Sequence, residues 1–532
     1  MNTIRRTSIT FMSSTVIRAL AILVCFPAVG HGDVTANLQL LRNRCLYFAI
    51  GYAPNCSSCI TIRHGLWAQS PIALSGEVDL AASGFSLAAL PAAVANGLIS
   101  SNAAVAIASN AAVQVRLMVT KATAASTTND ISLYGYRGVL FHYYVWDTVT
   151  GEFHCEAGVE ISPINTTLLL FGLMVSANYF GGSVAQDYAT ARDTIDWHDW
   201  FDPTVSQFWG SYIPGTGFSG HWDWYTQEAM LICVMAAMSD PQIDAVAAWH
   251  GWTRCLQTYV SPGPNSQTFT SYATYFGDPF TVCYGQAFLD FSRLSADFDG
   301  VAWFQQAQTA YQGNVEFFRK ERGYLDSLTL GFETGPNGAA SGTIAKPNAQ
   351  VNCSQNEPIT WPEATIYTVA GGLGYYSSTP ASNEVAQALS LLVDGGTLFG
   401  WHGWPNESVT ATDSTHEAAN PYIIGQDISL IAVAIDNYFT HRVQNLVLQD
   451  AQLRATLNHI FPPRNRSIQM VTNSQLSLRW QAVPFSTFTL QQTASLTGSW
   501  NGTTNLTASP DGFIDLIVPA SASQQFYRLH AP

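Results

Sequence analysis

The stretch that decides the fold joins an aromatic segment directly to an apolar one. It reads His221-Trp222-Asp223-Trp224-Tyr225-Thr226-Gln227-Glu228 and continues as Ala229-Met230-Leu231-Ile232-Cys233-Val234-Met235-Ala236-Ala237-Met238. The second half is apolar on every face over a helical length, which predicts a helix that is buried all round. Thr226 has the residue type of an N-cap, so Glu228 is expected in the first helical turn.

Glu228 therefore combines a carboxylate with an aromatic rim at the mouth of a core. Aromatic surface beside an acid suits sugar binding and proton transfer. For acid catalysis at neutral pH, burial must raise the pKa of this carboxyl against the opposing effect of the helix N-terminus. The alternative is a first-turn Glu that only complements the helix dipole.

The composition is that of a folded, acidic protein. The chain has 532 residues, of which 47% are hydrophobic and 11% charged, so it can bury a large core and disorder is excluded. Its formal net charge is −15, which argues against a nucleic-acid partner and suits a neutral ligand.

Residues 1–32 have the pattern of a secretory signal peptide. Arg5, Arg6 and Arg18 precede an apolar run over residues 19–29, which is too short for a membrane span. No other segment is expected to span a membrane. Removal of the signal takes away three Arg residues and no acid, so the formal charge moves from −15 to −18. The mature protein is expected to be secreted or periplasmic.

Cysteine usage agrees with export. Nine Cys residues are present, and eight remain once Cys25 leaves with the signal, an even number that permits disulfides in an exported chain. Cys56-Ser57-Ser58-Cys59 is a local disulfide or half of a metal site. Because no second CxxC and no paired His motif accompany it, we expect neither a metal nor another cofactor.

Buried and amphipathic helices alternate along the chain. Apolar helices are expected to start near Gly84, Ile164, Thr226, Thr281, Pro362 and Gln426. Each is followed by a helix with one apolar face, at residues 102–119, 184–197, 243–259, 301–321, 384–393 and 442–460. Six such pairs predict an all-α (α/α)6 toroid over residues 33–462, with ligands entering where the inner helix ends meet.

Long aromatic connections between these helices are expected to carry the ligand site. Residues 196–225 hold five of the fifteen Trp residues, and residues 396–420 form a second such loop. The candidate substrate-binding residues in the two loops are Trp222, Asp223, Trp224, Tyr225, Trp401, Trp404 and Glu417. The alternatives are core packing for the aromatic residues and an Asx-turn for Asp223.

A second domain is expected at residues 466–532. Pro462-Pro463-Arg464-Asn465-Arg466 has the composition of a linker. After it, short segments alternate with period two between Gly, Pro and Ser turns, at residues 476–480, 487–491, 513–518 and 525–529. This pattern predicts a small all-β sandwich. Its expected role is glycan binding, surface attachment or stability.

Between Asp79 and Phe461 the chain resembles the glucoamylase-like domain family, which includes bacterial endo-β-1,2-glucanases and the transglycosylating domain of cyclic β-1,2-glucan synthases. Six pieces occur in the family's order. They are Ser83-Gly84-Phe85-Ser86-Leu87-Ala88-Ala89-Leu90-Pro91, Glu160-Ile161-Ser162-Pro163-Ile164-Asn165-Thr166-Thr167, Tyr225 to Met230, Asp278 to Phe291, Gly342 to Pro358, and Ile424 to Tyr438. The resemblance implies an (α/α)6 toroid and a bacterial glycoside hydrolase.

The chain departs from the family pattern at positions near the expected substrate. Asn165 stands where the family has Asp, so a charge is missing there. Gln286 lies in the neighbourhood of the family's Q-Y-S-H segment, and Ser292 stands where an Arg commonly follows D-F. We expect Asn165 and Gln286 to bind substrate; capping its helix is the alternative for Asn165.

Glycoside hydrolysis needs a carboxylic acid and a second carboxylate. The resemblance implies the acid role for Glu228. Asp427 is the favoured base or water-positioning group, because it opens the last inner helix as Glu228 opens the third, and an inverting outcome is expected. Glu160 is the alternative second carboxylate. The structural alternatives are a dipole-complementing acid for Asp427 and a hydrogen-bonded structural acid for Glu160.

These features predict an exported glycoside hydrolase of the endo-β-1,2-glucanase type, with an oligo- or polysaccharide β-glucan as its substrate. The alternatives are a transglycosylase, a hydrolase of another glycan linkage, and a carbohydrate-binding protein without catalysis. No Ser-His-Asp signature, glycine-rich phosphate loop or HExxH motif occurs in the sequence, which disfavours esterases, nucleotide-binding enzymes and zinc proteases.

Overall fold

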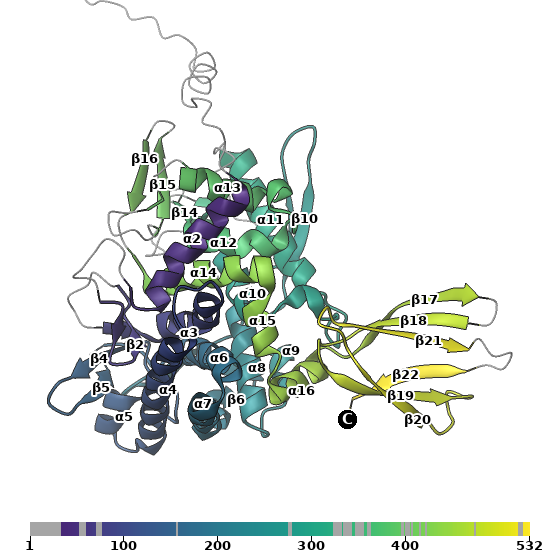
Figure 1. Cartoon of the computed structure of the whole chain (residues 1–532), viewed down its shortest axis with the longest axis horizontal. Helices are drawn as coiled ribbons and strands as arrows, with labels where there is room; N and C mark the ends of the chain where they lie inside the picture. Colours follow the sequence, from purple (N-terminus) through teal and green to yellow (C-terminus); the bar gives the residue numbers. More distant parts are fainter. Residues whose placement is uncertain are drawn as a thin grey trace, which may run out of the picture.

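The structure is a computed structural model. It describes residues 33–531 except for residues 53–59, 71–76, 156–157, 275–278, 323–331, 334–342, 346–355, 359–362, 395–397, 400–404, 406–407, 414–415, 421–422, 473–474 and 520–524. The predicted signal peptide, residues 1–32, and the pair Cys56 and Cys59 lie outside these residues. Within them the chain forms a large helical domain and a small C-terminal β domain, which projects from one side (Figure 1).

Six helices form the inside of the helical domain. They are α3 (Leu80–Ala95), α6 (Pro163–Phe180), α8 (Gln227–Ser239), α10 (Tyr284–Phe288), α12 (Ile366–Gly371) and α14 (Gly425–Thr440). Helix α8 is buried on nearly every face, as its uniformly apolar sequence predicts. In this order each helix contacts the next, and α14 contacts α3 again. The inner helices therefore follow one another around a common centre.

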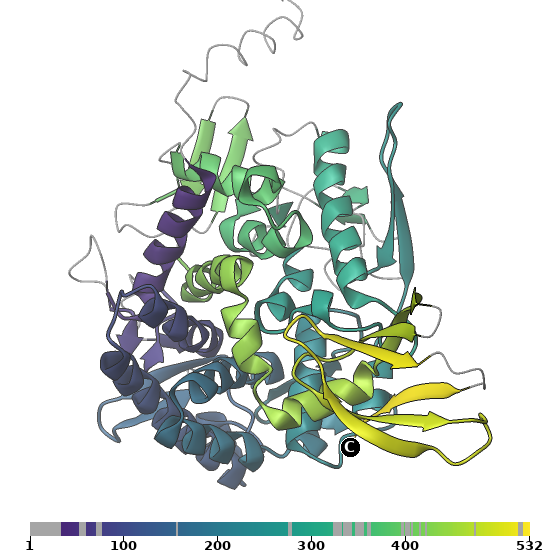
Figure 2. The same ribbon diagram turned by 45° about the vertical axis from the view of Figure 1, so that its right-hand side comes forward.

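More polar helices lie outside this group and bury one face against it (Figures 1 and 2). They are α2 (Val34–Ala49), α4 (Ser101–Ala124), α5 (Thr128–Tyr134), α7 (Gly182–Thr194), α9 (Ala245–His250), α11 (Trp303–Arg322), α13 (Glu384–Asp394), α15 (Arg442–Val447) and α16 (Ala451–Ile460). Helix α4 is long and apolar enough to span a membrane by composition, but its alanine-rich face packs on α3 and α7.

Three predicted helices differ from the structure. The helix expected at 243–259 ends at His250, and β9 (Leu256–Val260) follows, because this part alternates between exposed and half-buried residues with the period of a strand. The inner helix expected from Pro362 starts at Ile366, after β14 (Glu363–Thr365). The helix expected near Thr281 begins as the 3-10 helix η2 (Pro279–Val282).

Glycine allows the closest contact between two inner helices. A Cβ added at Gly172 on α6 would lie 1.8 Å from the carbonyl oxygen of Gly84 on α3. A Cβ added at Gly84 would lie 2.3 Å from the carbonyl oxygen of Leu168. The two backbones therefore touch without intervening side chains, which fixes the spacing of α3 and α6.

Two small antiparallel sheets stand where α3, α6 and α8 begin. One has the order β3-β4-β5, from Glu77–Asp79, Tyr143–Asp147 and Glu152–Cys155. The other has the order β6-β7-β8, from Phe201–Asp202, Gln207–Ile213 and Gly217–His221. Ile161, two residues before α6, forms bridges with Phe141 beside the first sheet and with Tyr212 in the second. This residue therefore ties both sheets to the start of α6.

The remaining elements of the helical domain are short strands and 3-10 helices. The strands are β1 (Ile62–Arg63), β2 (Leu66–Trp67), β10 (Thr268–Tyr272), β11 (Phe332–Glu333), β12 (Thr343–Ala345), β13 (Asn356–Pro358), β15 (Ser408–Asp413) and β16 (His416–Asn420). They form the sheets β1-β2, β10-β9, β12-β13 and β11-β14-β15-β16. The 3-10 helices are η1 (Trp197–Trp200), η3 (Phe291–Arg293), η5 (Gly372–Tyr375) and η6 (Pro380–Ser382).

The C-terminal domain consists of two three-stranded antiparallel sheets, as the period-two pattern predicts. Their orders are β17-β18-β21 and β20-β19-β22, from Arg464–Thr472, Gln475–Gln481, Phe513–Pro519, Asn501–Thr507, Thr487–Thr493 and Phe526–His530. The alternating residues Leu478, Trp480, Phe488, Ile514 and Val518 form a separate small core. The domain comes forward beside α16 in Figure 2.

Candidate active site

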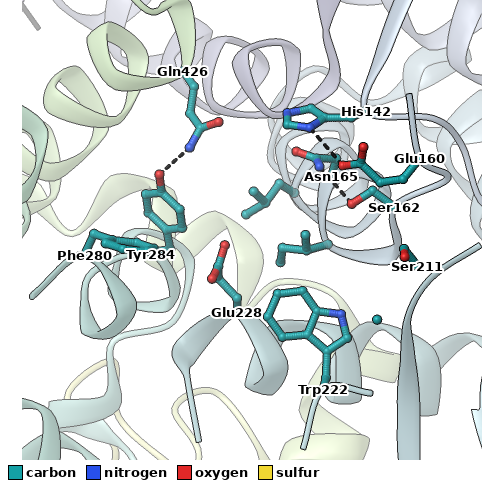
Figure 3. A pocket seen from close by; sticks show the side chains of 13 residues that line it. His142, Glu160, Ser162, Asn165, Ser211, Trp222, Glu228, Phe280, Tyr284 and Gln426 are labelled. Atoms are coloured by element: carbon teal, nitrogen blue, oxygen red, sulfur yellow. Dashed lines mark hydrogen bonds and ion pairs between the residues drawn. The ribbon is translucent and has the colours of Figure 1, made fainter. Parts of the chain in front are cut away.

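A cavity of about 430 Å³ opens at the N-terminal ends of α6, α8 and α14. Its polar wall includes His142, Glu160, Ser162, Asn165, Ser211, Glu228 and Gln426, and its aromatic wall consists of Trp222, Phe280 and Tyr284. Two carboxylates thus share one cavity with aromatic rings (Figure 3). The ends of inner helices meet here, as the predicted arrangement requires.

Glu228 extends into this cavity from the first turn of α8 (Figure 3). Thr226 is the N-cap, and its hydroxyl accepts a hydrogen bond from the Ala229 amide at 3.0 Å, which confirms the predicted helix start. The next residues of α8 are buried, so the helix holds Glu228 at the edge of the core. Burial raises the pKa of Glu228 to about 7.

Glu160 lies on another wall of the cavity, between β5 and α6 (Figure 3). Its side chain is 45% exposed, and its Oε1 lies 3.3 Å from His142 Nδ1. The hydrogen bond from His142 lowers the pKa of Glu160 below its ordinary value. At neutral pH this carboxyl is therefore ionised, whereas a large fraction of Glu228 retains its proton.

His142 connects Glu160 to a buried acid. Its Nε2 lies 4.0 Å from the Asp79 carboxylate, which is 2% exposed, and its ring stacks on Tyr143 at a centroid distance of 3.8 Å. Burial by itself lowers the pKa of His142, but the hydrogen bond with Glu160 and the charge of Asp79 raise it above the ordinary value. The ring therefore favours its protonated form between two carboxylates.

Asn165 lines the cavity in the first turns of α6 and is mostly buried. Its Nδ2 donates to the Ser162 hydroxyl at 2.8 Å. Ser162 also lines the cavity and precedes α6. An amide at this position provides both a donor and an acceptor for hydroxyl groups without adding a third charge.

Asp427 occupies the first turn of α14 and is only 6% exposed. It is not among the described residues that line the cavity. Its neighbour Gln426 lines the cavity instead and donates a hydrogen bond to the Tyr284 hydroxyl (Figure 3). The N-terminal ends of α8 and α14 therefore meet at one site, although the residue that α14 contributes differs from the predicted one.

Only Trp222 among the predicted residues of the first aromatic loop lines the cavity. Tyr225 is fully buried and packs on Trp303 at a centroid distance of 4.7 Å, which is the core alternative. Trp224 bridges to Thr253, and the Asp223 carbonyl accepts from the Thr253 amide at 2.6 Å. These contacts fasten the loop to the segment after α9.

Gln286 lies away from Glu228, in the wall of a second cavity of about 200 Å³. Its amide nitrogen Nε2 donates to Asp290 at 3.2 Å, and its backbone amide donates to Gln227 at 3.0 Å. Trp401 and Trp404 lie outside the described residues. Glu417 belongs to β16, where it pairs with Ala411.

Several residues of the cavity were not predicted from the sequence. His142 immediately precedes β4, Ser211 belongs to β7, and Phe280 belongs to the short 3-10 helix η2. Their positions depend on how the β3-β4-β5 and β6-β7-β8 sheets fold over the helix ends. The sequence offered a clue only for His142, because this residue lies in an aromatic segment 18 residues before Glu160.

The cysteines contribute no metal site in the described part of the chain, where no group of three or more His, Cys, Asp or Glu side chains is placed to hold an ion. Cys255 is disulfide-bonded. Cys45 and Cys233 are buried thiols, and burial raises the pKa of both.

Comparison with solved structures shows that the chain has a known fold. An endo-β-1,2-glucanase from Chitinophaga pinensis, solved with sophorotriose and glucose, aligns with a TM-score of 0.56 at 15% identity and covers 81% of this chain and 98% of its own. A protein from Bacteroides fragilis NCTC 9343, assigned provisionally as a glucoamylase, aligns with a TM-score of 0.61 at 17% identity over 82% and 99% of the two chains.

The chain shares their fold. A third structure with the glucoamylase-like fold, an endo-β-1,2-glucanase mutant from Talaromyces funiculosus with β-1,2-glucan, aligns with a TM-score of 0.54 at 11% identity over 81% of this chain and 92% of its own. No protein-family model and no curated protein sequence matches the chain. The glucoamylase-like fold therefore rests on the three-dimensional comparison.

Proposed function

We propose that the protein is a glycoside hydrolase of the endo-β-1,2-glucanase type that cleaves β-glucan by acid–base catalysis. The observation that carries this proposal is one cavity with two carboxyl groups whose pKa values are shifted in opposite directions. Burial raises the pKa of Glu228 to about 7, and His142 lowers that of Glu160. Such a pair matches the division into acid and base that glycoside hydrolysis needs.

The scaffold proposed for this site is an (α/α)6 toroid. Contacts run from α3 through α6, α8, α10 and α12 to α14 and back to α3, which agrees with a closed inner ring. The similarity to glucanase and glucoamylase-type structures supports the same arrangement. In such a ring the inner helix ends surround one cleft, which is where the cavity lies.

In the proposed mechanism Glu228 is the general acid and protonates the glycosidic oxygen as the bond to the leaving sugar breaks. Glu160 is the base that takes a proton from a water molecule attacking the anomeric carbon. The two groups extend from different walls of the cavity (Figure 3). The proposed outcome is inversion, in which the water molecule enters between them. Asp427 remains the alternative base, acting through a substrate hydroxyl.

A neutral glucan fits the other properties of the site. Trp222, Phe280 and Tyr284 offer ring faces and edges to sugar rings, while Ser162, Asn165 and Gln426 offer hydroxyl and amide groups to sugar hydroxyls. The structures with sophorotriose and with β-1,2-glucan support this substrate class. We also propose export to the periplasm or medium, on the basis of the N-terminal segment.

The test is digestion of a glycan panel that contains linear β-1,2-, β-1,3- and β-1,4-glucans and starch, with the wild type and with Glu228→Gln. We expect release of short oligosaccharides from β-1,2-glucan, a loss of ~1000-fold or more in kcat in the variant, and retained binding. Release from another glucan only would contradict the linkage. Longer products in place of hydrolysis products would identify a transglycosylase.

A second candidate, a carbohydrate-binding protein without catalysis, is favoured by Asn165, which replaces a family Asp. Binding without release in both the wild type and Glu228→Gln would establish it. If hydrolysis occurs, Glu160→Gln and Asp427→Asn distinguish the two bases. We expect the larger loss of kcat in Glu160→Gln because Glu160 lines the cavity; a larger loss in Asp427→Asn would assign the base to α14.

A further inference from the structure

A chain of three ionisable side chains leads from the cavity into the core. It consists of Glu160 and His142, which both line the cavity, and Asp79 at the N-terminal end of α3. Exposure decreases along this chain, from 45% for the Glu160 side chain through 24% for His142 to 2% for Asp79. The innermost charge is therefore a carboxylate that substrate does not reach.

The backbone fixes all three positions. The Asp79 carboxylate caps α3 by accepting from the Ala82 amide at 3.0 Å, and Asp79 pairs with Tyr143 in the β3-β4 register. The His142 carbonyl accepts from the Leu80 amide at 3.3 Å, and the His142 amide donates to the Glu160 carbonyl at 3.2 Å. The main chain of His142 is thus bonded to Glu160 itself and to Leu80, the residue that follows Asp79.

The orientation of the imidazole is fixed as well. Its ring stacks on Tyr143 at 14° between the planes, and the Tyr143 hydroxyl accepts from Gln69 Nε2 at 3.1 Å. In this orientation Nδ1 faces Glu160 and Nε2 faces Asp79. A cationic ring between two carboxylates offers a charge-assisted hydrogen bond to the acceptor on the cavity side.

We propose that His142 is a positioning residue that acts through Glu160: held by Asp79 and Tyr143, its ring keeps the Glu160 carboxylate ionised and directed into the cavity that contains Glu228. The catalytic consequence of this inference rests on the proposed function. The coupling between His142 and Glu160 does not depend on that function. No proton needs to pass to His142 during the reaction. Its role is to keep Glu160 free of protons before water is activated.

The charged and titratable groups that face this chain agree with the role. Glu77 on β3 and Tyr143 on β4 flank Asp79, and Glu228 faces the cavity from α8. His142 is the cation that lies against both Asp79 and Glu160, whereas the Arg63 guanidinium interacts with Glu77. Burial opposes the ionisation of Glu160, and the charge of His142 offsets this effect. Removal of His142 therefore raises the pKa of Glu160.

The first experiment measures the pH profile of kcat/KM for His142→Phe, which retains a ring that can stack on Tyr143, and for His142→Gln, which retains a hydrogen-bond donor. Relative to the wild type, we expect His142→Phe to lose roughly tenfold more kcat/KM on the acidic limb than at neutral pH. This is the size of effect that a neighbouring opposite charge exerts. His142→Gln and Asp79→Asn, which retains a cap for α3, should show smaller shifts in the same direction, with KM little changed.

His154→Gln is the matched control. His154 lies on β5 of the same sheet between two carboxylates, with Asp147 at 3.6 Å and Glu152 at 4.0 Å, but it does not line the cavity. Its profile should equal that of the wild type. An unchanged acidic limb in His142→Phe, or an equal shift in His154→Gln, would overturn the positioning role. Wild-type inactivity on every glucan would overturn only the proposed function.

The second experiment does not depend on activity. It measures, from pH 3 to pH 8, how Glu160→Gln changes the stability to urea in the wild-type and the His142→Phe backgrounds. Because the folded pKa of Glu160 is lowered, its ionisation stabilises the fold above the unfolded pKa, and this contribution is lost as pH falls. We expect the pH-dependent destabilisation by Glu160→Gln to disappear in His142→Phe. The same pH dependence in both backgrounds would refute the coupling.

Discussion

At the scale of single residues, two carboxyl groups of the same chemical type differ because their surroundings differ. Glu228 lies at the edge of an apolar helix, where burial makes the charged form unfavourable. Glu160 faces the solvent side of the same cavity and accepts a hydrogen bond from His142. Hydrolysis at the proposed site requires Glu228 protonated and Glu160 ionised, so activity should decline as pH rises through about 7.

The raised pKa of Glu228 also predicts a stability difference. The folded state binds the Glu228 proton more tightly than the unfolded state, in which the pKa is near 4.5. Stability of the wild type is therefore lost as pH rises from about 4.5 to about 7 and then levels off. We expect Glu228→Gln to be more stable than the wild type by about 3 kcal/mol at pH 8 and equal to it near pH 4, measured by urea unfolding.

Glu160→Gln provides the contrast, because the pKa of Glu160 is lowered rather than raised. Its substitution should destabilise the protein near neutral pH and have little effect at low pH.

A Glu228→Gln variant without added stability at pH 8 would show that the Glu228 carboxyl is not withdrawn from water. The proposed acid would then lack its physical basis.

At the scale of elements, the spacing between α3 and α6 depends on two glycines. Glycine inside a helix lowers stability relative to alanine by about 1 kcal/mol, because it loses more backbone entropy. At Gly172 only glycine fits despite this loss of stability, because a Cβ would lie 1.8 Å from the Gly84 carbonyl oxygen. The two helices carry Asn165 and the cap of α3, so their spacing also positions the cavity wall.

We expect Gly172→Ala to lower the free energy of unfolding by about 3 kcal/mol, since the added methyl group must push two inner helices apart. The measurement is thermal or urea unfolding followed by circular dichroism. Gly374→Ala is the control, because a Cβ there would meet its nearest atom at 3.7 Å, an ordinary contact. A loss of less than 1 kcal/mol in Gly172→Ala would contradict the close approach.

At the scale of the whole molecule, the β domain is fastened to the helical domain by buried hydrogen bonds. Gln481 Nε2 on β18 donates to the Leu294 carbonyl at 2.7 Å. Gly512 of the β domain has a φ of +78°, and a Cβ added there would lie 2.5 Å from the Arg293 carbonyl oxygen. Ser295 donates to the Pro462 carbonyl at 2.8 Å. The segment after α10 thus serves as a platform for the second domain.

Gln481→Ala should therefore destabilise the protein by about 1–3 kcal/mol, because the Leu294 carbonyl loses its buried partner. Urea unfolding measures this loss, and glycan release at saturating substrate should be unchanged. Arg479→Ala, on the exposed side of the same strand, removes the surface pair with Asp515 and a contact with the Phe513 ring, and should change stability by less than about 1 kcal/mol. Equal effects of the two substitutions would argue against a rigid junction.

Local patterns determined much of this protein. The uniformly apolar run after Glu228 determined a buried helix, Thr226 determined its start, and the period-two segments after residue 466 determined strands, because each of these properties depends on residues near in sequence. The pattern failed at residues 256–260, where alternation was interpreted as part of a helix although it belongs to β9.

Tertiary structure decided which residue at each helix end reaches the cavity. Successive helical residues are rotated by about 100°, so adjacent positions face different surroundings. On α8, Gln227 is buried and bonds to Gln286 and Tyr375, whereas Glu228 lines the cavity. On α14, Gln426 lines the cavity and Asp427 is buried. The sequence alone established that acids occur at these ends. Only the packing of the inner helices, and the folding of two small sheets over them, brought His142 and Glu160 to the cavity of Glu228.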